Sequence, residues 1–185
     1  MEQARVRLVM VGGAPGSGKS TVAAALAANL GWTLFRSDEL RKELARLPAL
    51  AHADSGYGES LYSSELSDKV YGELVARART ALGMGKSVVI DATWGRARHR
   101  RLAAALARET SSDLVELCCQ LPPEIAKQRI RARGEGDASD VTPAIADRLV
   151  RDFERWPSAT VIDNSGPPET AAEASLREVS APSRT

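Results

Sequence analysis

The sequence predicts one α/β domain in which helices cover both faces of a parallel β-sheet. Five short apolar runs alternate with segments of helical pattern along the 185 residues, and such alternation is typical of parallel sheets with crossover helices. A glycine-rich turn joins the first apolar run to the first helical segment, where folds of this class place a phosphate-binding loop. The length suits one domain, and 43% hydrophobic and 26% charged residues are ordinary for a globular chain.

Each expected strand is an apolar run of about four to eight residues bounded by turn-forming residues. The first run is followed by Gly12 and Gly13, and the fourth by Pro122 and Pro123. The expected strands are residues 5–11, 32–35, 87–90, 114–121 and 159–162.

The expected helices begin and end at recognisable capping residues. Gly31 ends the first helix, Pro48 follows the second, and Thr142 caps the sixth with Pro143 in its first turn. Segment 51–60 is polar and contains glycine, so we expect a loop there. The expected helices are residues 19–30, 37–47, 61–82, 96–109, 124–133, 143–155 and 169–179, followed by a frayed tail.

Charge and cysteine usage exclude several classes of protein. Twenty-five Lys and Arg oppose 24 Asp and Glu, giving a net charge of +1, so no overall field favours nucleic acid or an anionic membrane. Cys118 and Cys119 are adjacent and imply no disulfide framework, which favours a reducing cytoplasm. No apolar run approaches the roughly 18 residues of a membrane-spanning helix. We therefore expect a cytoplasmic protein that makes no membrane contact.

Residues 13–21 match the phosphate-binding pattern GxxxxGK[ST] between a predicted strand and a predicted helix. Glycines let the backbone curl so that several N–H groups point at phosphate oxygens. Lys19 is expected to reach the β- and γ-phosphates and act in catalysis, and the Ser20 hydroxyl to ligate Mg²⁺. No guanine-reading motif is present, which favours ATP. The expected nucleotide-binding residues are Gly13, Ala14, Pro15, Gly16, Ser17, Gly18, Lys19, Ser20 and Thr21.

Two aspartates follow predicted strands. Asp91 ends the third strand, where nucleotide enzymes place a carboxylate near the metal, so we expect it to help hold Mg²⁺; a strand-end or capping aspartate is the alternative. Asp38 follows the second strand, which in a parallel sheet ends beside the phosphate loop. There Asp38 can accept a proton from an acceptor hydroxyl, and Arg41, one helical turn later, can hold a substrate anion. Alternatively Asp38 caps a helix and Arg41 is a solvated charge.

Two arginine clusters complete the candidate site. Arg129 and Arg133 lie four residues apart on one face of a helix that runs into glycines. This pattern indicates a lid that brings guanidinium groups onto the transferring phosphoryl; cations at a helix C-terminus are the alternative. Segment 96–101 is the densest basic cluster and is either a solvated helix face or an acceptor-side anion site formed by Thr93 and Arg100.

Four segments together resemble the small P-loop kinase-like family: GAPGSGKST, RSDELRKEL, GKSVVIDATW and RIRARGEGDASD. The family includes polynucleotide 5′-kinase, zeta-toxin-like and gluconate-kinase-like enzymes. The resemblance covers about residues 5–165. Within the family, the chain most resembles the ATP-binding module of bacterial two-domain phosphotransferase proteins. The resemblance implies a fold of the nucleoside-monophosphate-kinase type, strand order 2-3-1-4-5 and a missing phosphotransferase-like partner domain. It also implies that Asp38 and Arg41 bind the acceptor, and that Arg129 binds nucleotide while Arg133 acts in catalysis.

These observations predict an ATP- and Mg²⁺-dependent phosphotransferase with Asp38 as general base and an acceptor that bears a hydroxyl. The acceptor is either a small molecule or a nucleic-acid 5′ end, so a polynucleotide 5′-hydroxyl kinase is one alternative. An ATP-binding regulatory module of a partner domain, with no acceptor of its own, is another. The expected kinase-like domain spans residues 1–168 with a lid at about 129–142, and residues 169–185 form a C-terminal helix and tail.

Overall fold

Strands and helices alternate along the chain as the sequence predicts. The computed structural model describes residues 5–46, 63–132 and 141–181. Its strands are β1 (Arg7–Gly12), β2 (Thr33–Arg36), β3 (Val88–Asp91), β4 (Asp113–Gln120) and β5 (Thr160–Asp163). Its helices are α1 (Lys19–Leu30), α2 (Ser37–Arg46), α4 (Ser64–Gly83), α5 (Ala97–Glu109), α6 (Pro123–Ala132), α7 (Pro143–Arg151) and α8 (Pro168–Ser180).

The five strands form one parallel sheet in the order β2-β3-β1-β4-β5. The central strand β1 pairs with β3 on one side and β4 on the other, with Val11 opposite Asp91 and Gly12 opposite Cys118. The predicted fold class and strand order are therefore confirmed.

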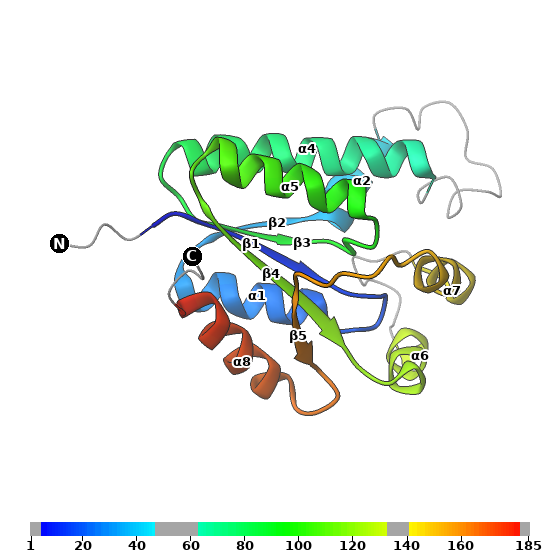
Figure 1. The fold of residues 1–185 in the computed structure, drawn as a ribbon. Coiled ribbons are helices and arrows are strands. Elements are labelled where there is room, and N and C mark those ends of the chain that lie inside the picture. The colour runs from blue at the N-terminus through cyan, green and yellow to red at the C-terminus, as the bar shows by residue number, and fades with distance from the viewer. Residues whose placement is uncertain (1–4, 47–62, 133–140, 182–185) are drawn as a thin grey trace.

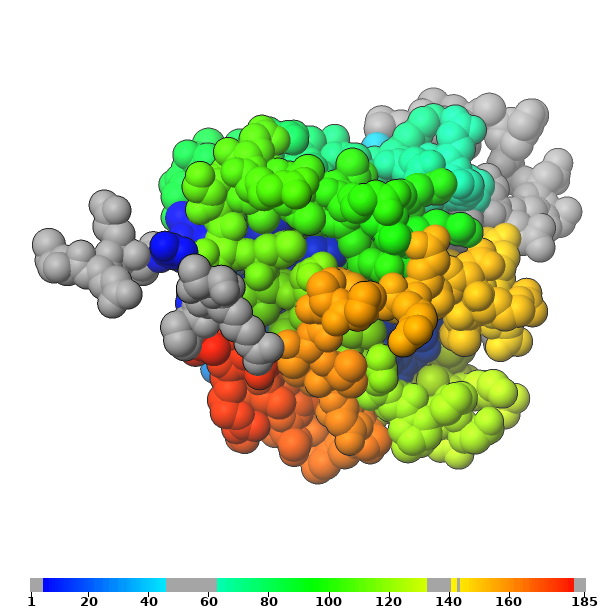
Figure 2. Space-filling model, viewed as in Figure 1, coloured from blue at the N-terminus to red at the C-terminus, as the bar shows by residue number. Residues whose placement is uncertain are grey.

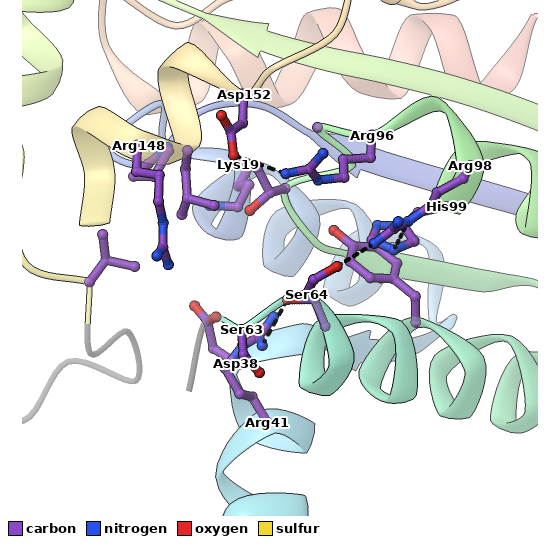
Figure 3. Close-up of a pocket in the computed structure, with 17 residues that line it drawn as sticks. Lys19, Asp38, Arg41, Ser63, Ser64, Arg96, Arg98, His99, Arg148 and Asp152 are labelled. Atoms are coloured by element: carbon purple, nitrogen blue, oxygen red, sulfur yellow. Dashed lines mark hydrogen bonds and ion pairs between the residues drawn. The ribbon is translucent and has the colours of Figure 1, made fainter. Parts of the chain in front are cut away.

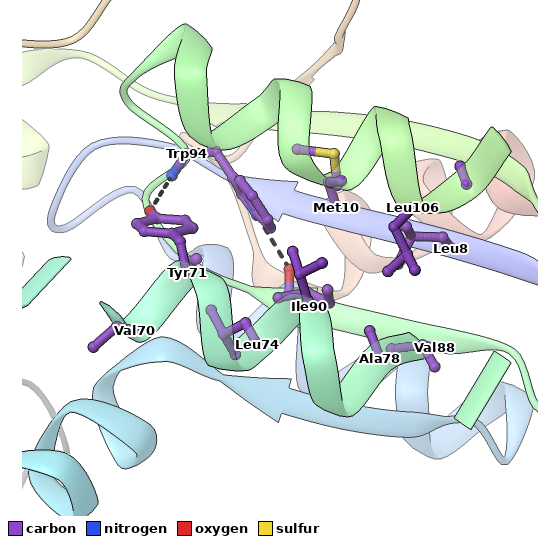
Figure 4. Close-up of a cluster of buried hydrophobic side chains, with 14 of the residues drawn as sticks. Leu8, Met10, Val70, Tyr71, Leu74, Ala78, Val88, Ile90, Trp94 and Leu106 are labelled. Atoms are coloured by element: carbon purple, nitrogen blue, oxygen red, sulfur yellow. Dashed lines mark hydrogen bonds between the residues drawn. The ribbon is translucent and has the colours of Figure 1, made fainter. Parts of the chain in front are cut away.

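Helices cover both faces of the sheet, with α4 and α5 on one side and α1 and α8 on the other (Figure 1). Side chains of β1 alternate between the two faces, as strand geometry requires. Leu8 and Met10 are buried in the cluster beneath α4 and α5, which Figure 4 shows around Leu74 and Leu106. Val9 and Val11 are buried in the opposite cluster, among residues of α1 and α8. Because both faces are covered, the central strands β1 and β3 are apolar and buried over most of their length.

The carboxyl edge of the sheet carries the functional segments. Helices α1, α2 and α5 begin just beyond the carboxyl ends of β1, β2 and β3, so their N-termini gather at this edge. Helices α6 and α7 lie beyond the same edge (Figure 1). Ligands of open parallel sheets bind at this edge.

One helix is shorter than predicted. Helix α7 ends at Arg151 instead of residue 155, because the following backbone bonds elsewhere: the Glu154 N–H donates to the Gly95 carbonyl at 2.8 Å. The chain between α7 and β5 lies on the surface between α5 and α8 (Figure 2, orange). Other boundaries differ little, with Ser63 capping α4 by accepting the Leu66 N–H. The loop predicted at 51–60 and the end of the tail lie outside the described residues.

Within the described part of the chain, no helix combines the length and apolar character that crossing a membrane requires. Cys118 and Cys119 are buried free thiols. Burial raises the pKa of Cys119 to about 12, so this thiol is protonated and serves as a packing residue of β4.

Candidate active site

The predicted phosphate loop, which we call the P-loop (residues 13–21), curls tightly between β1 and α1. Gly13 has φ +141° and Gly18 has φ +78°, both in the region that favours glycine. A Cβ at Gly13 would lie 2.5 Å from the Cys119 carbonyl oxygen, and one at Gly18 would collide with Nδ2 of Asn164. The Gly13 N–H donates to the Thr93 carbonyl at 3.2 Å. The loop conformation therefore depends on glycine at these positions and on contacts with two other loops.

Asn164 is a site residue that the sequence analysis missed. It follows β5 directly and is 4% exposed. Its side-chain Nδ2 donates to the Ser17 carbonyl at 2.7 Å. Its backbone carbonyl accepts a hydrogen bond from Nη2 of Arg129 at 3.1 Å. Its N–H donates to the Gln120 carbonyl at 2.8 Å. A polar residue at the end of a strand was the available signal, the same signal that singled out Asp91.

A cavity of about 270 Å³ opens beside the P-loop. The lining includes Pro15, Lys19, Asp38, Arg41 and Thr93, so the structure brings five of the predicted site residues around one space. We call this space the Asp38 cavity (Figure 3). Lys19 opens α1 and Thr93 follows β3, so the sheet itself positions the two side chains.

Asp38 and Arg41 share one side of α2. Asp38 lies in the first turn of the helix and is half-buried. Arg41 is only 6% exposed, and its Nη1 donates to Oγ of Ser67 at 3.4 Å. The alternative that Arg41 is a solvated surface charge is therefore wrong, because its guanidinium is enclosed between α2 and α4.

Asp91 ends β3 with one carboxylate oxygen bonded and the other unbonded. Oδ2 accepts a hydrogen bond from Nε of Arg36 at 3.3 Å. Oδ1 is buried and has no hydrogen-bond partner among the described residues. A buried carboxylate oxygen without a partner is costly, so this atom is suited to a cation.

The predicted acceptor-side arginine requires a correction. Arg100 is 8% exposed and does not line the Asp38 cavity. Its guanidinium donates to the carbonyls of Trp94 at 2.7 Å, Arg155 at 2.8 Å and Glu154 at 3.3 Å. Arg100 is thus a structural anchor for the chain after α7.

Arg96 and Arg98 line the cavity instead of Arg100. Arg96 pairs with Asp152 at 2.9 Å, and Arg98 pairs with Asp68 at 2.7 Å. Trp94 is fully buried, so its ring cannot stack against a base from solvent. The basic cluster therefore does contribute arginines to the cavity, but not the one predicted.

His99 and Tyr71 form one wall of the cavity. Their rings stack with centroids 3.9 Å apart, and Nε2 of His99 lies 2.7 Å from Oδ1 of Asp68. Burial lowers the pKa of His99, and the hydrogen bond and charge of Asp68 only partly oppose this. Tyr71 accepts a hydrogen bond from the Trp94 N–H at 2.9 Å, so this wall also holds the turn after β3.

The predicted lid is described only at its ends. Arg129 lies beside the P-loop, where its Nη1 would be 3.3 Å from a Cβ at Gly18. Arg133, predicted to act in catalysis, lies outside the described residues.

Known structures share this fold across almost the whole chain. A sugar kinase from Janibacter sp. HTCC2649 superposes with a TM-score of 0.72 at 22% identity, covering 94% of each chain. A gluconokinase from Sinorhizobium meliloti 1021 gives 0.71 at 16% identity, covering 95% of this chain and 91% of that one. The Mycobacterium tuberculosis APS kinase CysC, in complex with AMPPNP and APS, gives 0.70 at 19% identity and covers 96% and 99%.

Closer in sequence is the uncharacterized protein Rv2004c of Mycobacterium tuberculosis, which is 37% identical over 169 residues. That match covers 91% of this chain but only 34% of the relative, so the chain spans about a third of the relative's length. The family model described as an AAA domain, AAA_33, matches residues 8–156. This match runs from Leu8 of β1 to Trp156 and includes the P-loop and every residue named around the Asp38 cavity. The chain belongs to the AAA_33 family of AAA domains, and its fold is that of the small P-loop kinases.

Proposed function

We propose that this chain transfers the γ-phosphoryl group of ATP to a hydroxyl group of an acceptor bound in the Asp38 cavity. The observation that carries the proposal is that Lys19 of the P-loop and Asp38 of α2 line the same cavity. A cation for the phosphates and a carboxylate for the acceptor proton therefore face one space, as an in-line transfer between two bound substrates requires.

The chain's own residues divide the work of this reaction. The backbone N–H groups of residues 13–21 and the N-terminus of α1 would hold the phosphates, and Lys19 would stabilise negative charge on the γ-phosphoryl. Asp38 would accept the proton of the attacking hydroxyl while the new O–P bond forms and ADP leaves. Arg41, enclosed beside Asp38, would orient the acceptor together with Thr93, which also lines the cavity.

The residues present also fit Mg²⁺, which prefers carboxylate and hydroxyl oxygens. Asp91 supplies a buried oxygen without a partner among the described residues, and Ser20 lies in the first turn of α1. We propose that Ser20 and Asp91 would hold the ion. When bound, the ion would neutralise charge on the phosphates.

The lid assignment is part of the same proposal. Arg129 is held beside the P-loop by the Asn164 carbonyl, which supports a contact with nucleotide. Arg133 follows one helical turn later in the sequence, and we propose that it neutralises the transferring phosphoryl when the segment at about 129–142 closes.

A transfer assay with γ-labelled ATP tests the proposal. Wild-type protein is incubated with pools of hydroxyl acceptors, including sugars, nucleosides and 5′-hydroxyl oligonucleotides, and Lys19→Ala is the matched inactive variant. We expect label in at least one pool and none with Lys19→Ala. Labelling of oligonucleotides alone would identify the polynucleotide kinase alternative.

One observation favours a second candidate function. The matched relatives are about three times as long as this chain, which covers 34% of their length, so a partner domain such as the phosphotransferase-like one would have room in the longer protein. In this alternative the chain binds ATP and regulates that partner without an acceptor of its own. Tight ATP binding with no labelled pool, together with nucleotide-dependent affinity for the rest of the relative, would favour it over the kinase.

A further inference from the structure

Tyr71 carries a buried hydroxyl group at the wall of the Asp38 cavity. The residue lines the cavity and is only 5% exposed. Its oxygen accepts a hydrogen bond from the Trp94 N–H at 2.9 Å, as Figure 4 shows. Thr93 and Gly95, the two neighbours of Trp94 in the sequence, both line the cavity. This bond therefore places the hydroxyl end of Tyr71 beside the cavity.

The hydroxyl proton of Tyr71 has no acceptor in the part of the chain that the structure describes. The bond with Trp94 uses the Tyr71 oxygen as an acceptor, so the O–H group remains available as a donor. Burial raises the pKa of Tyr71 to about 12, so the proton stays on the oxygen at physiological pH. Because a buried donor without a partner is costly, an oxygen atom of a ligand in the cavity is a favourable partner.

The surroundings of Tyr71 hold this hydroxyl group in one position. The Tyr71 ring stacks on the His99 ring with centroids 3.9 Å apart, and it packs against the Trp94 ring at 5.0 Å. Trp94 has φ +54°, a conformation that residues with a side chain rarely adopt. Its carbonyl accepts a hydrogen bond from Arg100 at 2.7 Å, so the turn is held on both sides of Trp94. A donor fixed in this way selects a ligand that presents an oxygen at one place.

We propose that Tyr71 is a specificity-determining residue that donates a hydrogen bond to a second oxygen of the acceptor, separate from the hydroxyl that is phosphorylated. The inference rests on the proposed function and names the class of acceptor, a polyhydroxy compound. Asp38 on α2 faces the reacting hydroxyl, whereas Tyr71 belongs to another wall of the cavity, on α4. A simple alcohol or a deoxy analogue would be rejected, because it would leave the buried donor unpaired.

A binding measurement tests the donor apart from transfer. The protein is labelled with ¹³C at tyrosine Cζ, whose chemical shift reports hydrogen bonding by the hydroxyl. Tyr71 is one of three tyrosines, so the variants Tyr57→Phe and Tyr62→Phe assign its signal. The ADP-saturated wild type is titrated with D-ribose, D-glucose and adenosine, each with its single-deoxy analogues. We expect at least one parent compound to shift the Tyr71 signal, and one of its deoxy analogues to bind roughly 10–100-fold more weakly.

A comparison of variants and substrates separates donation to the acceptor from support of the fold. Tyr71→Phe removes the hydroxyl, and Ser175→Ala is the matched control, because it removes another buried hydroxyl that bonds to a carbonyl within α8. The value of kcat/KM is measured for the acceptor found in the labelling assay and for its deoxy analogues. We expect wild type and Ser175→Ala to prefer the acceptor over one analogue by roughly 10–100-fold, and Tyr71→Phe to lose this preference. A purely structural role would slow both reactions equally.

The outcomes separate this inference from the proposed function. A Tyr71 signal that no compound shifts, or a Tyr71→Phe protein that keeps the wild-type preference, would overturn the inference. A shift of the Tyr71 signal that depends on one ligand hydroxyl, without transfer to any acceptor, would support the hydrogen bond and contradict the kinase. Transfer to an acceptor that leaves the Tyr71 signal unmoved would support the kinase and overturn the inference. If Tyr71→Phe does not fold, the titration of the wild-type protein decides alone.

Discussion

At the scale of single residues, Asn164 connects the P-loop to two neighbouring elements. Its side-chain amide holds the Ser17 carbonyl at 2.7 Å, its carbonyl holds Arg129, and its N–H bonds to the end of β4. The orientation of the Ser17 carbonyl bears on which way the adjoining N–H groups of the P-loop point. A residue outside the P-loop can thus affect nucleotide binding through the backbone of the loop.

We therefore expect Asn164→Ala to weaken ATP binding by roughly tenfold, because the Ser17 carbonyl, left without its donor, turns and misaligns the adjoining N–H groups of the P-loop. Ser175→Ala is the matched control: Ser175 is also fully buried and donates to a backbone carbonyl, that of Ala171 at 2.7 Å, but lies within α8. Calorimetric titration of ATP and the melting temperature are measured on both variants. Equal ATP affinities for the two variants would contradict the role of Asn164.

The pair of His99 and Asp68 predicts a specific pH dependence. Burial lowers the pKa of His99 below 6.5, whereas Asp68 raises it in part. A folded-state pKa below the unfolded value means that the unfolded chain takes up the proton first, so stability falls as the pH drops through 6.5. We expect an NMR titration of His99 to give a pKa below 6.5, and Asp68→Asn to lower it further. A value that rises in Asp68→Asn would show that the partner assignment is wrong.

At the scale of elements, helix α1 begins and ends at left-handed glycines with different surroundings. Gly18 has φ +78° and no room for a Cβ beside Asn164, whereas Gly31 has φ +67° and nothing within 4 Å of a Cβ. Both alanine variants incur the conformational cost of about 1–2 kcal/mol. We expect only Gly18→Ala also to lower ATP affinity, by roughly tenfold or more, because it displaces Asn164. Comparable ATP affinities in the two variants would contradict the role of Gly18 and Asn164 in shaping the P-loop.

The Arg100 anchor gives a prediction for α5. Arg100→Ala leaves three backbone carbonyls without their donor, so we expect a loss of roughly 3 kcal/mol in the free energy of unfolding. Arg101→Ala, an exposed neighbour on the same helix, should change stability by no more than about 0.5 kcal/mol. Chemical denaturation measures both. A wild-type stability for Arg100→Ala would restore Arg100 as a candidate ligand-binding arginine.

Sequence patterns predicted the elements well but did not determine how each helix is rotated. The predicted strands and helices recur within a few residues because apolar runs and capping residues are local signals. The sequence analysis predicted that Arg100 binds the acceptor. However, Arg100 lies three and seven residues before the buried Ala103 and Ala107, and this spacing marks the inner face of α5. The shortened α7 could not be predicted in this way, because the chain that follows it bonds to Gly95 and Arg100, which are distant from it in sequence.

In the candidate site, too, local sequence signals predicted some residues, whereas residues placed by packing between distant segments were missed. The P-loop, Asp38 and Arg41 follow strand ends, so the parallel topology alone brings them to one edge of the sheet. Arg148, which also lines the Asp38 cavity, was not predicted, because its position depends on how α7 packs beyond that edge (Figure 1). Distant packing of this kind leaves no local pattern in the sequence.

At the scale of the whole molecule, the parallel sheet gathers helix N-termini at its carboxyl edge. Helices α1, α2 and α5 each begin just beyond a strand, and α4 also begins at the Asp38 cavity. Their dipoles and the cation of Lys19 make this edge attractive to phosphate. The single carboxylate that faces this space without a cationic partner at salt-bridge distance in the described structure is Asp38, and the account depends on its acting as the base.

Asp38→Asn tests that central claim most directly. Asparagine has nearly the same shape but cannot accept the proton, and the loss of one charge from the first turn of α2 costs only about 0.3–1 kcal/mol, so the fold should be retained. We expect transfer to the identified acceptor to fall by roughly 10²–10⁴-fold, while the melting temperature and the calorimetric affinity for ATP stay close to wild type. Lys19→Ala, measured in parallel, should lose ATP affinity as well as transfer. Near-wild-type transfer by a folded Asp38→Asn protein would contradict the account.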